Sequence, residues 1–169
     1  MPRLPDNITF GEAALLEPLS VAIQALRDAG GLRLGSGALI CGSGPIGLLT
    51  AAAARASGAH PLVITDIEPK RLEYAKKIVP QCITYKVDTK LTDAENAEAI
   101  RALYGSTEYS APETVLQCTG VDSSATIGFH AVRKGGQVII VGVGKDSFKN
   151  FPTLLLISKT VSWSPSELA

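Results

Sequence analysis

Short apolar runs alternate with helix-like segments along most of the chain. Ala38–Cys41 is a continuous apolar run, typical of a strand that is buried on both faces of a sheet. An alanine-rich segment with a helical pattern, Pro45–Ser57, follows it and ends at Gly58. The same alternation predicts further strands at Leu62–Thr65, Cys82–Tyr85, Val115–Cys118, Val138–Val141 and Thr160–Trp163. It predicts further helices from Pro69 to the residue before Pro80, from Thr92 to about Tyr104, over Ser123–Arg133 and over Leu154–Ser158. Because such alternation favours right-handed crossovers, we predict an α/β fold with a doubly wound, mostly parallel sheet of about six strands and helices on both faces.

The N-terminal part of the chain has a helical pattern without strands. Thr9 and Glu12 have the spacing of a capping box, which predicts a short turn over Ala13–Leu16. A second helix is predicted roughly over 18–28, with Glu17 at its N-terminal edge. We therefore predict a single domain over 31–169, preceded by a helical segment over 1–30.

Composition narrows the possible functions. Sixteen basic residues balance sixteen acidic ones, and a net charge of zero disfavours binding to the phosphates of nucleic acid. No uncharged apolar run reaches about 18 residues, and the N-terminus has no signal-peptide pattern, so we expect no membrane span and a cytoplasmic location. The three cysteines are scattered, which suits a reducing compartment, and neither histidine has metal-ligand spacing from a cysteine. We therefore predict no metal site.

A glycine motif lies between the first predicted strand and its helix. Gly42, Gly44 and Gly47 form the pattern G-x-G-x-x-G at this position. The first glycine allows the tight turn, the second allows a pyrophosphate to approach the backbone, and the third allows the helix to pack on the sheet. The amino end of the helix would offer unpaired N–H groups to phosphate. The motif predicts a dinucleotide site, and the alternative is a purely structural turn.

An acidic residue at the end of the second predicted strand supports this interpretation. Asp66 lies 19 residues after Gly47, close to the distance of about 20 that is typical for the residue that binds the adenosine ribose. Its charge would repel a 2′-phosphate, so we predict NAD rather than NADP as the cofactor. Arg71 could stack on adenine or contact a phosphate, and the alternative is a solvated side chain on a helix.

The order of these motifs resembles that of a known family. The segments LLEPLSVAIQAL, GALICGSGPIGLLTAAAARASGA, VITDIEPKRLEYAKK, QCTG and GGQVIIVGVG are similar to those of medium-chain dehydrogenases, and within them to the sorbitol, xylitol and L-arabinitol dehydrogenases. The resemblance extends from about Leu4 to about Pro152. It implies cofactor contacts by these residues: Gly44, Pro45, Ile46, Asp66, Arg71, Thr119, Gly120, Val141, Gly142 and Val143.

This sequence differs from the family pattern in two respects. Family members carry an N-terminal catalytic domain that binds zinc, and its zinc-binding Cys and His-Glu segments have no counterpart here. The segment from Ser162 to Ala169 also departs from the family, which typically has an Arg-containing segment there. The resemblance places Glu17 next to the catalytic metal of polyol dehydrogenases. Glu17 is thus the candidate general base of a zinc-independent reaction, and the alternative is an N-terminal helix cap.

Three functions are compatible with these observations. The first is an NAD(H)-dependent oxidoreductase without catalytic zinc, acting on a small alcohol or carbonyl. The second is an NAD(H)-binding module without turnover, either a sensor, a truncated remnant or a subunit of a larger enzyme. The third is a non-redox enzyme, such as a cyclase or isomerase, that uses the exposed cleft. Relatives pair their sheets through the last strand, so the resemblance also implies a homodimer through Thr160–Trp163.

Overall fold

A computed structural model describes residues 3–142, 144, 152–159 and 161–165 of the chain. The strands are β1 (Ala38–Cys41), β2 (Leu62–Asp66), β3 (Ile83–Lys86), β4 (Thr114–Gln117), β5 (Gln137–Ile140) and β6 (Ser162–Pro165). The helices are α1 (Phe10–Ala13), α2 (Leu16–Asp28), α3 (Pro45–Ala56), α4 (Pro69–Ile78), α5 (Asp93–Ala102), α6 (Asp122–Ala131) and α7 (Thr153–Lys159), and a 3₁₀ turn covers Glu108–Ser110. The alternation of strands and helices thus matches the sequence prediction.

The six strands form one parallel sheet in the order β3-β2-β1-β4-β5-β6. Ile40 on the central strand β1 lies opposite Ile64 on one side and Leu116 on the other. The strand order reverses direction between β1 and β4, and in such sheets ligands bind at the carboxyl ends of the strands on either side of that point. The predicted fold class is confirmed.

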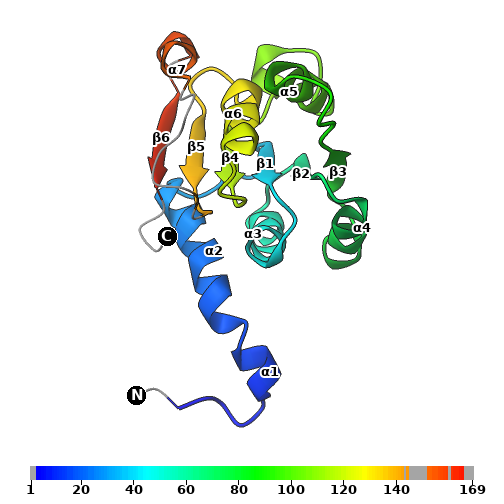
Figure 1. Ribbon diagram of the computed structural model, residues 1–169. Coiled ribbons are helices and arrows are strands. Elements are labelled where there is room, and N and C mark those ends of the chain that lie inside the picture. Colours follow the sequence, from blue (N-terminus) through cyan, green and yellow to red (C-terminus); the bar gives the residue numbers. More distant parts are fainter. Residues whose placement is uncertain (1–2, 143, 145–151, 160, 166–169) are drawn as a thin grey trace.

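Helices cover both faces of the sheet (Figure 1). Helices α2, α3 and α4 lie on one face, and α5, α6 and α7 lie on the other. Successive strand residues point to opposite faces, so Ile40 packs into the cluster under α3 while Leu39 packs into the cluster under α6. All residues of β1, β2 and β4 are buried, which explains why these strands are continuous apolar runs rather than alternating ones.

The N-terminal helices begin earlier than the sequence suggested. The capping box is present, since the Thr9 side chain accepts from the Glu12 amide, but α1 starts directly after Thr9 instead of at Ala13. Helix α2 starts at Leu16 instead of near residue 18. Pro18 is compatible with this position because amides in the first turn of a helix have no partner within the helix. Glu17 is therefore inside the first turn of α2.

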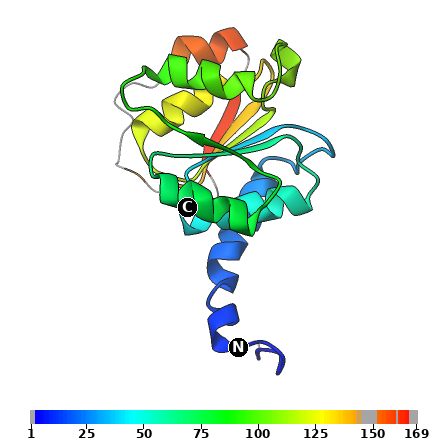
Figure 2. The same ribbon diagram turned by 90° about the vertical axis from the view of Figure 1, so that its right-hand side faces the viewer.

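An N-terminal arm, residues 3–20, projects from the body of the molecule (Figures 1 and 2). None of its residues is buried, and Phe10, Leu15 and Leu16 are strongly exposed. From Ala22 onward α2 packs closely against α3, and the Gln137 side chain donates to the Ala29 carbonyl at 2.7 Å. No helix in the described part of the chain combines the length and apolar character of a membrane span.

Candidate functional site

The glycine loop connects β1 to α3, and two of its glycines are required by the packing of the loop itself. Gly42 has a φ of +100°, in the region that favours glycine. A Cβ on Gly47 would lie 1.9 Å from the carbonyl oxygen of Gly42, which is inside van der Waals contact. These two positions therefore exclude any larger side chain, whether or not a ligand is present.

Gly44 has a different environment. It is the N-cap residue of α3, with a φ of −74°, and no side chain caps this helix end. A Cβ on Gly44 would meet no protein atom within 4 Å. There is thus open space beside Gly44 at the amino end of α3, as needed for a phosphate group at a helix N-terminus, where the N–H groups of the first turn have no partner within the helix. The loop fits a dinucleotide pyrophosphate.

Asp66 ends β2 beside this loop and is held by hydrogen bonds. Its Oδ2 accepts from the Ser43 amide at 2.9 Å and from the Ser43 hydroxyl at 3.1 Å. Its Oδ1 accepts from the Glu68 amide at 2.9 Å. The Arg71 guanidinium lies 3.8 Å from Oδ2, and most of its side chain is exposed. Asp66 itself is only 8% exposed, so a ligand can reach only a small part of its carboxylate.

The loops after β4 and β5 close the other side of the site. The Thr119 amide and hydroxyl both donate to the side-chain oxygen of Gln117, and the Thr119 hydroxyl accepts from the Val121 amide at 3.1 Å. A Cβ on Gly142 would lie 2.4 Å from the Gly120 nitrogen, so the two loops are in direct contact. Val141 is buried, and its amide donates to the Gln117 carbonyl.

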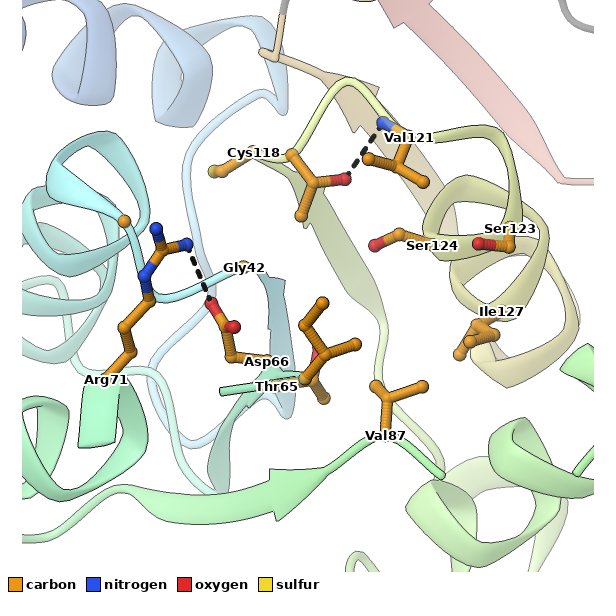
Figure 3. A pocket seen from close by; sticks show the side chains of 13 residues that line it. Gly42, Thr65, Asp66, Arg71, Val87, Cys118, Val121, Ser123, Ser124 and Ile127 are labelled. Carbon is orange, nitrogen blue, oxygen red and sulfur yellow. Dashed lines mark hydrogen bonds and ion pairs between the residues drawn. The ribbon is translucent and has the colours of Figure 1, made fainter. Parts of the chain in front are cut away.

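The glycine loop, the ends of β2 and β3, the loop after β4 and the start of α6 line a cavity of about 300 Å³ at the carboxyl ends of β1, β2, β3 and β4 (Figure 3). Of the residues predicted to contact the cofactor, Gly42, Gly44, Asp66, Arg71 and Thr119 line it. Pro45, Ile46, Gly47, Gly120, Val141 and Gly142 lie in the adjoining loops and helix start without lining it, and Val143 is outside the described residues. The fold therefore brings together the glycine loop, the acidic residue and the loop after β4.

Several residues that line the cavity were not among the predicted contacts. They are Thr65, Ile67, Val87, Cys118, Val121, Ser123, Ser124 and Ile127. Val87 follows β3, and the last four lie just before or in α6. Because all of them lie near the carboxyl ends of parallel strands, the predicted topology was a signal that could have identified them.

The cysteines near the site are not activated. Burial raises the pKa of the Cys118 thiol to about 12, with a small opposing effect from the Thr50 hydroxyl. Burial also raises the pKa of Cys41 to about 12. Both thiols are therefore protonated near neutral pH, when they are poor nucleophiles.

Glu17 is placed apart from the cavity. Its side chain is exposed in the first turn of α2, on the N-terminal arm, and Glu17 does not line the cavity. Its role as a general base stays a prediction. Within the described ranges, no group of three or more His, Cys, Asp or Glu side chains is arranged to hold a metal ion.

A doubly wound parallel sheet with a glycine loop after β1 and a carboxylate at the end of β2 defines the Rossmann-type class of α/β domains. Residues 45–167 match the family described as "Zinc-binding dehydrogenase". The chain belongs to this family, which confirms the resemblance to medium-chain polyol dehydrogenases seen in the sequence.

Individual relatives agree with this assignment. The chain is 46% identical over 148 residues to L-arabinitol 4-dehydrogenase of Aspergillus oryzae, a match covering 85% of this chain and 38% of that protein. It is 42% identical over 144 residues to sorbitol dehydrogenase of Bos taurus, with coverage of 85% and 38%. The crystal structure of L-idonate 5-dehydrogenase from Escherichia coli superposes with a TM-score of 0.79 at 28% identity and covers 96% of this chain and 43% of that one. The matched region thus spans about two fifths of the length of these relatives.

Proposed function

We propose that this chain binds NAD(H) and provides the cofactor site of an oxidoreductase that acts on a small alcohol or carbonyl. The observation that carries the proposal is the open space in front of Gly44 at the amino end of α3, beside the buried carboxylate of Asp66. The relatives named as L-arabinitol and sorbitol dehydrogenases support the type of reaction.

The residues of this chain have distinct roles in the proposal. The glycine loop and the first turn of α3 bind the pyrophosphate through backbone N–H groups. Asp66 accepts hydrogen bonds from the adenosine ribose, and its negative charge disfavours a 2′-phosphate, so NAD is favoured over NADP. The loop after β4 lines the cavity beside the glycine loop, and the start of the loop after β5 packs against it from behind. When bound, the nicotinamide ring supplies hydride transfer.

Zinc independence is a further part of the proposal, with Glu17 as the group that handles the alcohol proton. The matched region of this chain spans only about two fifths of the length of its relatives. This favours a second candidate function, a cofactor-binding module that works with residues of another polypeptide segment.

The test begins with calorimetric titration of the protein with NADH. Saturable binding is expected, and absence of heat at millimolar nucleotide would refute the proposal. A second measurement follows NADH absorbance, as its loss with NADH and small ketoses and as its gain with NAD⁺ and polyols, with and without a chelator. Oxidation that is insensitive to chelator supports the zinc-independent enzyme, loss of oxidation with chelator refutes zinc independence, and binding without turnover supports the binding module.

A further inference from the structure

Ser43, the residue between the first two motif glycines, makes contacts that the motif does not explain. It is only 2% exposed, although it lies in a loop. Both its amide and its hydroxyl donate to the same oxygen, Oδ2 of Asp66, across 23 positions of sequence. The residue therefore ties the loop that would bind the pyrophosphate to the carboxylate that would bind the ribose.

The hydrogen bonds of Asp66 limit how it can bind a ligand. An ionised carboxylate has about four lone-pair positions, two on each oxygen. Ser43 occupies both positions on Oδ2, and the Glu68 amide occupies one on Oδ1. The remaining acceptor position is therefore on Oδ1.

Arg71 competes with Ser43 for the same oxygen. Its guanidinium lies 3.8 Å from Oδ2, which is longer than a charge-assisted hydrogen bond of about 2.8 Å. Its side chain is largely exposed, and at this distance it forms a long ion pair with Asp66 (Figure 3). Without the Ser43 hydroxyl, Oδ2 would have a vacant position and Asp66 could turn to form a closer ion pair with Arg71.

We propose that Ser43 is a positioning residue that sets the preference for NAD by holding Asp66 away from Arg71, with Oδ1 available to the adenosine ribose. The inference rests on the proposed function, since it concerns the same site. It assigns the loop serine a role in cofactor selection that is distinct from the role of the glycines. The buried hydroxyl acts through the carboxylate and does not itself contact the ligand.

The experiment compares dissociation constants for NADH and NADPH, measured by calorimetry on the full chain. In Ser43→Ala we expect NADH affinity to fall about tenfold or more, the cost of one hydrogen bond to a charged group, while NADPH affinity changes less than twofold. The ratio of the two affinities therefore falls. Ser57→Ala is the matched control, because Ser57 is exposed at the opposite end of α3 and its hydroxyl donates only to the Ala53 carbonyl.

A second background separates positioning from a general structural effect. In Asp66→Asn, the additional Ser43→Ala change should leave the NADH to NADPH ratio unchanged within twofold. Ser43→Cys keeps a side chain of similar shape but replaces the hydroxyl with a weak donor. It should lower the ratio of NADH to NADPH affinity as Ser43→Ala does, and it provides the test if Ser43→Ala folds poorly.

The outcomes separate a failure of the role proposed for Ser43 from a failure of the proposed NAD(H)-binding function. An unchanged ratio in folded Ser43→Ala or Ser43→Cys overturns the role of Ser43 and leaves the proposed function intact. A fall in the ratio of equal size in the Asp66→Asn background also overturns it, because Ser43 would then act independently of the carboxylate. No binding of either nucleotide to the wild-type chain overturns the proposed function, and the inference with it.

Discussion

At the scale of single residues, glycine stands at the three positions of the loop after β1 for different physical reasons. At Gly42 and Gly47 the backbone conformation and the neighbouring carbonyl exclude a side chain. At Gly44 the protein leaves room for one. Because its own fold does not require Gly44, this glycine supports the proposed pyrophosphate site at the amino end of α3.

This difference predicts the behaviour of two matched variants. Gly44→Ala should change the free energy of unfolding by less than about 1 kcal/mol: its φ suits alanine and no clash results, which favours the variant, while alanine is a poorer N-cap residue than glycine. NADH affinity should nevertheless fall by about tenfold or more, since a methyl group would occupy the path of the pyrophosphate. Chemical denaturation and calorimetry measure the two quantities.

Gly47→Ala provides the comparison within the same loop. Its Cβ would collide with the Gly42 carbonyl, so stability should fall by roughly 1–3 kcal/mol. If Gly44→Ala bound NADH as tightly as the wild type, the assignment of the pyrophosphate to this helix end would be wrong.

The residues that the sequence identified are those with local signatures. Gly42, Gly44 and Gly47 lie between one strand and its helix, and Asp66 ends the next strand at a typical spacing. The sequence pattern alone therefore predicts them. The double contact of Ser43 with Asp66 depends on how two neighbouring strands end relative to each other, which no local pattern encodes.

At the scale of elements, the strands of the sheet were predicted to within one or two residues. Residues of the inner strands β1, β2 and β4 are all buried, which favours apolar runs that the sequence shows directly, while β3, β5 and β6 were found from shorter apolar segments between predicted helices. The helix starts near the N-terminus were less accurate. The 3₁₀ turn Glu108–Ser110 was not predicted, since its capping box has Ser110 where glutamate is usual. Weak capping signals and a proline at the third position of α2 shift boundaries without changing the topology.

Glu113, just before β4, joins elements at the opposite end of the sheet from the cavity. Its Oε1 accepts from Arg33 at 2.7 Å and Arg133 at 2.8 Å, and its Oε2 accepts from the Ser36 hydroxyl. Burial would raise the pKa of Glu113, but the Ser36 hydrogen bond and the two arginines together outweigh it, and the pKa lies below its ordinary value.

Glu113→Gln should therefore destabilise the protein by about 1.5–3 kcal/mol near pH 7, the range for hydrogen bonds to charged groups. A carboxyl whose pKa is lower in the folded state stabilises the protein above its unfolded pKa of about 4.3, and this contribution is lost as the pH falls through the folded value. The difference from the wild type should shrink below about pH 4. Urea denaturation at several pH values measures it.

Glu98→Gln is the matched control for this prediction, because Glu98 is an exposed carboxylate on α5 and the charge change is the same. It should alter stability by less than about 0.5 kcal/mol. An equal loss in both variants would contradict the role of the arginine cluster.

At the scale of the whole molecule, the sheet ends in an open edge. Strand β6 pairs with β5 on one side and is the last strand in the order of the described sheet. We propose that two copies associate through this edge, as the sequence suggested, because unpaired strand edges favour pairing with another chain.

Multi-angle light scattering should then give the mass of two chains for the wild type. Ser162→Lys, which places a charge on the exposed start of β6, should shift the population toward monomer. Ser158→Lys adds the same charge to an exposed position on α7 and should remain dimeric. A wild-type monomer at high protein concentration would contradict the proposal.

All residues that line the cavity fall between Gly42 and Ile127. One continuous stretch of the polypeptide, from the loop after β1 into α6, therefore supplies the entire lining. A sequence change confined to the N-terminal arm, residues 3–20, therefore alters neither the buried core nor any side chain that lines the cavity.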